Sequence, residues 1–161
     1  MKDKSELLNF IVNLAKETGK NQLLYFGKKL STKTKSSNID FFTEADLTSE
    51  KFIISEIEKK YPEHSILTEE SGFYDKKSEF RWVIDPLDGT TNFKNNIPIF
   101  AVSIALQKNE KTIYAAVYNP AADKCFYAEK KQGAFLNGDR IYISSSNTLS
   151  DSLLVTGFPY Q

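Results

Sequence analysis

The sequence predicts an α+β fold in which an antiparallel sheet is flanked by two long helices. Apolar residues recur at helical spacing over the first third of the chain, and from about residue 82 they alternate with a period of two. Turn motifs separate the alternating segments. With 161 residues, of which 40% are hydrophobic and 26% charged, the chain has the size and composition of a globular domain that needs no disulfides.

The first predicted helix begins after Asp3, with Glu6 three residues later as in a capping box, and ends near Gly27. Its apolar positions are Leu7, Leu8, Ile11, Leu14, Ala15, Leu23 and Leu24. The second begins near Asp46 and ends at Pro62, because a proline ring cannot continue a helix. Its apolar positions are Leu47, Ile54, Ile57 and Tyr61.

Six later segments alternate in hydrophobicity and are predicted as strands: 82–84, 100–106, 112–118, 125–128, 134–136 and 141–143. The predicted turns between them are Asn109-Glu110, residues 119–123, Gln132-Gly133 and Asn137-Gly138. A short apolar strand ends at Leu67, and residues 153–156 are predicted to form a last strand.

Charge, cysteine usage and hydropathy exclude several classes of protein. Lys plus Arg equals Asp plus Glu at 21 each, and the lysines are scattered, so nucleic acid is not an expected partner. The single cysteine, Cys125, lies in an alternating segment, where a structural strand position is expected. No apolar run approaches the ~20 residues that span a bilayer, and the N-terminus lacks a signal peptide. We therefore expect no membrane partner and a cytoplasmic location.

The segment 82–93, WVIDPLDGTTNF, carries the strongest chemical signal. An apolar strand leads directly into Asp85, and Pro86, Asp88 and Gly89 favour a turn there. The two carboxylates can converge on a hard cation, with backbone carbonyls between them as further oxygen ligands. The segment therefore predicts a Mg²⁺ site at the end of a strand.

Neighbouring residues predict a phosphate site beside the cation. Gly89 allows close backbone approach, and the amides of Gly89, Thr90 and Thr91 can face a phosphate if a short helix begins at Thr90. Upstream, Glu69 and Glu70 end another short strand and offer a third carboxylate. Two aspartates and a glutamate can hold two divalent cations about 3.5–4 Å apart. Such a pair of cations activates water and stabilises the leaving oxygen of a phosphate ester.

Each of these residues also has an ordinary structural interpretation. Asp-x-x-Asp-Gly occurs in surface turns for conformational reasons, Glu69 and Glu70 suit a solvated loop, and Asp46 suits a helix N-cap. His64 is expected to be exposed in a polar turn. A phosphoaspartate mechanism of the haloacid dehalogenase type is excluded, because Pro86 stands where its nucleophile would be.

Taken together, WVIDPLDGTTNF followed by IPIFAVSIAL resembles the signature of the inositol monophosphatase family, within the lithium-sensitive, metal-dependent phosphatases. Further segments agree in order and spacing: Lys35, Asp40, Thr43 and Asp46, then Thr68 to Ser71, then the hairpin from Gly133 to Ser144. The resemblance covers nearly the whole chain. It implies the N-terminal domain of the layered inositol monophosphatase/fructose bisphosphatase-like fold.

The resemblance also implies roles for residues. The metal ligands would be Glu69, Asp85, the carbonyl of Leu87, and Asp88. The residues that orient and deprotonate the attacking water would be Glu69, Thr90 and Asp46. The substrate-binding residues would be Asp88, Gly89 and Thr90. Water would attack phosphorus in line, without a phosphoenzyme intermediate.

By this resemblance, residues 1–149 form the metal- and phosphate-binding domain, and residues 150–161 begin a second α/β domain. The expected protein is a homodimeric, Mg²⁺-dependent phosphomonoesterase that hydrolyses inositol monophosphate or a related sugar phosphate. Fructose bisphosphate, NADP and adenosine bisphosphate remain alternative substrates. The alternative function is a truncated, noncatalytic module that associates with an intact partner.

Overall fold

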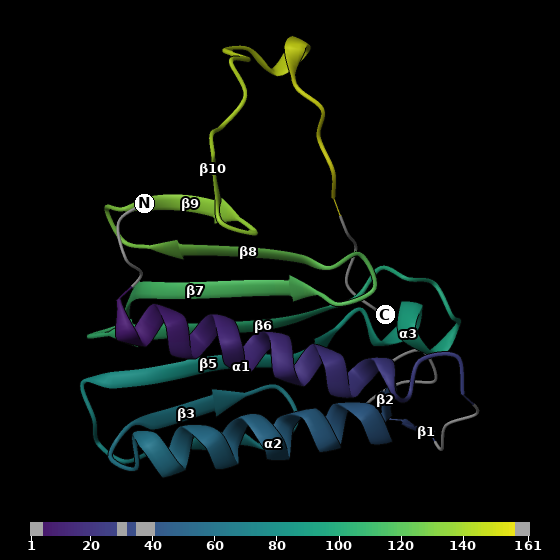
Figure 1. Ribbon diagram of the computed structural model, residues 1–161, viewed down its shortest axis with the longest axis vertical. Coiled ribbons are helices and arrows are strands. Elements are labelled where there is room, and N and C mark those ends of the chain that lie inside the picture. The colour runs from purple at the N-terminus through teal and green to yellow at the C-terminus, as the bar shows by residue number, and fades with distance from the viewer. Residues whose placement is uncertain (1–4, 29–31, 35–40, 157–161) are drawn as a thin grey trace.

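The computed structural model describes residues 5–28, 32–34 and 41–156. It confirms the α+β class: two long helices, α1 (Glu6–Leu23) and α2 (Glu44–Lys60), lie beside a large, mostly antiparallel sheet (Figure 1). Within the described ranges, no helix combines the length and the apolar character that crossing a membrane requires.

Among the described residues, the large sheet has eight strands in the order β10-β9-β8-β7-β6-β5-β3-β4. Their bounds are β3 (Ser65–Thr68), β4 (Gly72–Tyr74), β5 (Phe80–Asp88), β6 (Ala101–Lys108), β7 (Lys111–Asn119), β8 (Lys124–Glu129), β9 (Gly133–Leu136) and β10 (Asp139–Ile141). Neighbouring strands are antiparallel except β3 and β5, which run parallel. The remaining elements are a separate antiparallel pair, β1 (Thr32–Thr34) with β2 (Phe41–Thr43), the short helix α3 (Thr90–Lys94) and a 3₁₀ turn (Leu149–Asp151).

Two of the predicted hairpin turns have the backbone that their residues favour. Asn109 and Glu110 between β6 and β7 both have positive φ, at 47° and 61°, as do Asn137 and Gly138 between β9 and β10, at 50° and 107°. Two consecutive positive φ angles define the turn whose twist matches antiparallel strands. These predictions are confirmed.

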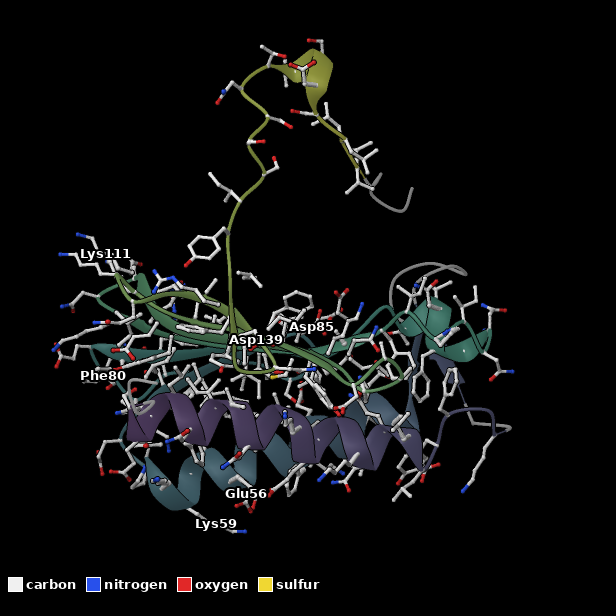
Figure 2. The ribbon with its side chains drawn as sticks, turned by 45° about the horizontal axis from the view of Figure 1, so that its top comes forward. Glu56, Lys59, Phe80, Asp85, Lys111 and Asp139 are labelled. Carbon is white, nitrogen blue, oxygen red and sulfur yellow. The ribbon has the colours of Figure 1, made fainter. Side chains whose placement is uncertain are left out.

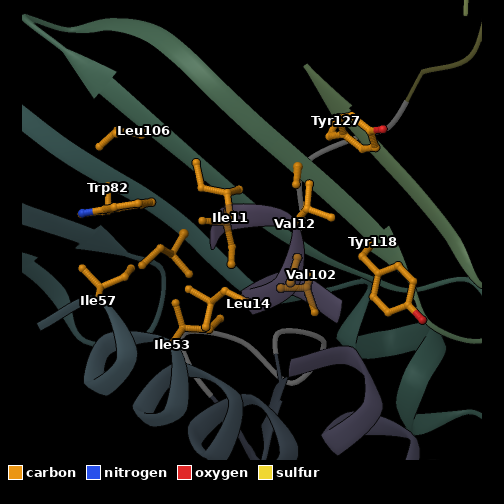
Figure 3. Close-up of a cluster of buried hydrophobic side chains, with 14 of the residues drawn as sticks. Ile11, Val12, Leu14, Ile53, Ile57, Trp82, Val102, Leu106, Tyr118 and Tyr127 are labelled. Atoms are coloured by element: carbon orange, nitrogen blue, oxygen red, sulfur yellow. The ribbon is translucent and has the colours of Figure 1, made fainter. Parts of the chain in front are cut away.

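Both long helices cover the same face of the sheet. Helix α1 contacts β6, β7 and β8, whereas α2 contacts β5. Side chains from both helices meet those of the strands in one continuous core, in which Ile11, Ile53 and Trp82 are fully buried (Figure 3). Cys125 is fully buried in β8, as its structural interpretation predicts.

The ends of α1 differ from the sequence prediction. Asp3 lies outside the described residues, and the N-cap is Ser5, whose hydroxyl accepts a hydrogen bond from the Leu8 amide at 3.2 Å. The helix ends at Leu23, so Leu23 and Leu24 are not core residues and are 40% and 63% exposed. The apolar spacing therefore identified the helix but not its last turn.

Helix α2 buries polar residues that the sequence analysis did not place on its packed face. Its buried residues include Asp46, Ser49 and Glu50 together with Ile53 and Ile57. Of the apolar positions predicted from the sequence, Ile57 is fully buried, Ile54 and Tyr61 pack partly buried against the core, and Leu47 is partly buried. Polar side chains occupy the buried face near the N-terminal end of α2, which is the end that approaches the site described below.

The chain after β10 also departs from prediction. Strand β10 ends at Ile141 instead of spanning 141–143, and residues 153–156 form no strand. Figure 1 shows this segment extending away from the sheet, where Ile143 and Leu153 are 98% and 100% exposed. A strand requires a neighbouring backbone to pair with, and no described strand lies beside residues 153–156. The domain boundary at 149/150 stays a prediction.

His64 was expected to be exposed and is half-buried instead. Its ring stacks on Tyr61 and Phe80, with centroid distances of 5.1 and 4.8 Å. Its Nδ1 accepts a hydrogen bond from the Trp82 indole N–H at 3.2 Å. Burial lowers the pKa of His64 below its ordinary value, because the charged form loses hydration.

We predict that Trp82 fluorescence titrates with pH through His64. A protonated ring cannot accept the indole hydrogen bond, so the signal should change with a midpoint below pH 6.5. Because the folded pKa is lowered, the unfolded chain binds the proton first as pH falls. His64 therefore stabilises the fold above about pH 6.5 and less below it.

The chain has one tryptophan and one histidine, which makes the assignment direct. Fluorescence of the folded chain and urea unfolding at pH 7.5 and 5.5 measure the two effects. His64→Gln keeps an acceptor without titrating, and should remove the fluorescence titration. A titration that persists in His64→Gln would contradict the prediction.

Candidate active site

A bulge in β5 determines where its two aspartates point. Asp85 pairs with Ser103 of β6, but Asp88 pairs with Ala101, so three steps along β5 match two along β6. Side chains three apart on a regular strand face opposite sides of the sheet, and one extra residue restores the same side. Pro86, which lacks an N–H group, suits this interruption of the ladder. The predicted turn is thus a bulge within a strand that continues to Asp88.

The parallel pairing of β3 and β5 brings Glu69 beside Asp85. Thr68 is in register with Ile84, and the next residue of each strand is an acid. Trp82 and Ile84 face the helices, so the alternation places Asp85 on the opposite face of the sheet (Figure 2). The Glu69 carboxyl group is close enough to Asp85 to affect its ionisation, and the Asp88 charge also acts on Asp85.

This crowding of carboxylates changes the proton affinity of Asp85. Burial is the largest cause, followed by the charges of Glu69 and Asp88, and together they raise the pKa of Asp85 to about 7. Asp88 and Glu69 are exposed. The site therefore opens to solvent and carries negative charge that either a proton or a cation can neutralise.

Asp46 and Thr90 form a second part of the site. Asp46 is 1% exposed in the first turn of α2, and its Oδ1 accepts a hydrogen bond from the Thr90 hydroxyl at 2.9 Å. The same hydroxyl lies 3.0 Å from the Leu87 carbonyl oxygen. A hydroxyl has one proton, so it donates to one of these acceptors at a time. The carbonyl is released for another partner whenever Thr90 donates to Asp46.

Gly89 connects the bulge to α3 and is required by its surroundings. Its φ is +86°, and a Cβ at this position would lie 2.9 Å from the carbonyl oxygen of Ile99. Both facts exclude larger residues without rearrangement. The N–H groups that open α3 have no partner within the helix by geometry. Their binding of phosphate stays a prediction.

Two residues that the sequence analysis missed support this arrangement. The Gln22 side-chain amide donates to the carbonyl oxygen of Pro86 at 2.6 Å and to the Ser49 hydroxyl at 3.2 Å, which ties both helices to the bulge. Glu50 is buried against the turn that carries Glu69. The available signal was the spacing of Asp46, Ser49 and Glu50, which places them on one helical face with Ile53.

The structure brings Glu69 and Asp88 near Asp85, and it joins Thr90 to Asp46 and to the Leu87 carbonyl. The roles of these residues remain predictions. Lys35 and Asp40 lie outside the described residues, and only the backbone of Thr43 is described. Within the described part of the chain, no three Asp, Glu, His or Cys side chains are already arranged around a metal position. The donor set nevertheless fits a hard cation, because it consists of oxygens and concentrates negative charge around Asp85.

Fold and site together define a class: an α+β layer of the inositol monophosphatase/fructose bisphosphatase type, with acids at the ends of two parallel strands. The sequence pattern of the inositol monophosphatase family matches residues 3–161. The chain therefore belongs to the inositol monophosphatase family, as its sequence resemblance predicts.

Several relatives show how much of such a protein the chain represents. Nus factor SuhB of Vibrio cholerae is 41% identical over 158 residues, covering 96% of this chain and 59% of the relative. The extragenic suppressor protein suhB of Bartonella henselae superposes with a TM-score of 0.84 at 38% identity, covering 88% of this chain and 56% of that one. An IMPase of Thermotoga maritima superposes with a TM-score of 0.83 at 34% identity, covering 87% of this chain and 54% of that one. The chain spans just over half the length of these relatives.

The names of the relatives correct one expectation. The proteins most similar in sequence include Nus factor SuhB of Vibrio cholerae and of Escherichia coli, the latter 48% identical over 128 residues, covering 79% of this chain and 48% of the relative. The name Nus factor conflicts with the expectation that nucleic acid is excluded as a partner, and that exclusion is withdrawn. Balanced net charge argues only against nonspecific attraction to a polyanion.

We predict that Asp85→Asn flattens the pH dependence of stability in metal-free buffer. The folded pKa of about 7 exceeds the ordinary 3.8, so Asp85 in the folded chain holds its proton more tightly than in the unfolded chain. Its contribution to stability is therefore present below about pH 4 and lost as pH rises to about 7. Asparagine carries no such dependence.

Urea unfolding in EDTA at pH 5 and pH 8 measures this difference. The natural chain should lose more stability between the two pH values than Asp85→Asn does. Asp139→Asn, at an exposed position on β10, is the matched control and should behave as the natural chain. If the natural chain and Asp85→Asn lost equal free energy of unfolding between the two pH values, ionised Asp85 would not destabilise the fold and the prediction would be wrong.

Proposed function

We propose that this chain supplies the metal- and phosphate-binding site of a Mg²⁺-dependent phosphomonoesterase that hydrolyses inositol monophosphate or a related sugar phosphate. The observation that carries the proposal is the meeting of Glu69, Asp85 and Asp88, through strand register and a bulge, beside the Asp46–Thr90 hydrogen bond. Membership of the inositol monophosphatase family supports it.

In this proposal the oxygen ligands of the metal are Glu69, Asp85, Asp88 and the carbonyl of Leu87. Bound Mg²⁺ would lower the pKa of water and neutralise charge on the phosphate and the leaving oxygen. Three of these ligands, Asp85, Leu87 and Asp88, lie within the bulged segment 85–88. In this proposal, strand pairing would hold these ligands in position.

Asp46, Thr90 and Glu69 have the catalytic roles. Buried Asp46 accepts a hydrogen bond from the Thr90 hydroxyl, so the lone pairs of Thr90 Oγ1 are left to accept a hydrogen bond from water. Glu69, which is exposed beside Asp85, would take the second proton of the same water. Asp88 and the amides of Gly89 and Thr90 would hold the substrate phosphate.

The finer parts of the proposal concern substrate and assembly. Inositol phosphate, fructose bisphosphate, NADP and adenosine bisphosphate all present a phosphate ester that this site would accept. A homodimer and a cytoplasmic location are proposed from family resemblance. None of the residues described above selects among these substrates.

A binding module without catalysis is the second candidate function. Apolar side chains of the segment 142–155 are exposed, among them Ile143, Leu153 and Val155, as are Val117 and Phe126 on the sheet. Such surfaces are typical of regions that other protein covers. A Nus-factor role, after the name of the relatives, belongs to this candidate, with an intact family member or nucleic acid as the partner to be tested.

We predict that Asp88→Asn strongly weakens Mg²⁺ binding without unfolding the chain. Asp88 is exposed, so the substitution removes a ligand charge and little packing. Metal ligation is worth several kcal/mol, so affinity should fall by at least ~100-fold. Calorimetry with Mg²⁺ measures affinity, and release of phosphate from inositol 1-phosphate, with and without Mg²⁺, measures catalysis.

Asp139→Asn is again the control, since it makes the same change at an exposed site on β10. Mg²⁺-dependent phosphate release that is lost only in Asp88→Asn supports the enzyme. If the chain binds Mg²⁺ but releases no phosphate, and elutes with an intact relative in size-exclusion chromatography, the module is supported. Unchanged Mg²⁺ binding and phosphate release in Asp88→Asn would refute the proposed ligand set.

A further inference from the structure

Glu50 is a buried carboxylate that contacts neither Asp85 nor Thr90 in any hydrogen bond described above. It is 2% exposed on the inner face of α2. Its Oε2 accepts hydrogen bonds from the Thr68 hydroxyl and, at 3.1 Å, from the Glu70 amide. Its Oε1 accepts one from the Ser71 hydroxyl. Three donors from the β3–β4 turn thus converge on this one side chain.

These donors belong to the residues immediately before and after Glu69 in the sequence. Thr68 precedes it, and Glu70 and Ser71 follow it. The turn itself is tight, because Thr68 pairs with Gly72, whose φ is +83°. With the residues before and after Glu69 held by α2, its backbone cannot shift toward or away from Asp85 independently of the helix.

The chemistry of the contact requires a carboxylate. A buried charge is unfavourable unless hydrogen bonds compensate it, and here three donors do so. A glutamine would offer one acceptor oxygen in place of two, and its amide would face a donor. An apolar residue would leave the Glu70 amide and two hydroxyls without this acceptor.

The same helix carries Asp46 one turn earlier. Asp46 reaches Thr90 after β5, while Glu50 reaches the turn after β3. Helix α2 therefore sets the spacing between the two segments that hold the site. That spacing determines how close Glu69 comes to the carboxylates of β5.

We propose that Glu50 is a positioning residue, which holds the turn 68–71 so that Glu69 reaches the metal site. It acts through Glu69 and touches neither substrate nor metal. The inference rests on the proposed function, because it assigns to Glu69 the role of metal ligand. It adds a determinant of metal affinity that lies outside the ligand set.

The test compares Glu50→Gln with Glu58→Gln, the same change on the exposed side of the same helix. Calorimetry measures Mg²⁺ affinity, amide hydrogen exchange measures the mobility of residues 69–71, and thermal unfolding reports stability. Glu50→Gln should weaken Mg²⁺ binding by about 10–100-fold, the usual effect of losing a group that orients a ligand. Exchange at 69–71 should quicken, and Glu58→Gln should change neither.

Ser71→Ala provides a second variant that removes one donor from an exposed turn residue and leaves the helix intact. It should weaken Mg²⁺ binding in the same direction by less, and it decides the question if Glu50→Gln does not fold. A merely structural Glu50 would lower the unfolding temperature while Mg²⁺ affinity stayed unchanged in every folded variant, and that result overturns the inference. If the natural chain binds no Mg²⁺, the proposed function fails and this inference with it.

Discussion

The site depends on a single extra residue in β5. Without the bulge between Asp85 and Asp88, strand alternation would send the two carboxylates to opposite faces of the sheet. The bulge also places Pro86 where its missing N–H costs no ladder bond and presents its carbonyl to buried Gln22. Strand pairing on both sides then fixes this geometry, with β3 on one side and β6 on the other.

Helix α2 divides its buried face between two tasks. Ile53 and Ile57 pack in the core with Trp82, whereas Asp46, Ser49 and Glu50 face the strand ends. Buried acids contribute less to stability than apolar residues would in the same positions. Burial of Asp85 and the nearby charges of Glu69 and Asp88 raise its pKa to about 7. Both effects lower the stability of the folded chain when no metal is bound.

Sequence periodicity predicted most elements, because alternation and helical spacing both reflect which side faces the core. It was wrong where polar residues are buried or apolar ones exposed. In α2 the apolar pattern identified Ile54 and Ile57, which pack in the core, but did not show that Asp46, Ser49 and Glu50 are buried on the same helix. His64 was expected in solvent because its neighbours in sequence are polar, yet its spatial neighbours are the rings of Tyr61, Phe80 and Trp82.

The sequence by itself determined the family, the order of the two long helices and most strands, the Asn109 and Asn137 turns, and the acids available at 69, 85 and 88. These features are local, since each depends on residue types at short spacing. Only the tertiary structure decided which of these residues meet. The parallel register puts Glu69 beside Asp85, and a hydrogen bond joins Thr90 to Asp46, 44 positions away in the sequence. Hydrogen bonds to Glu50 hold the residues next to Glu69. The physical reason is that strand register and helix docking are set by burial of the whole core, which no short segment encodes.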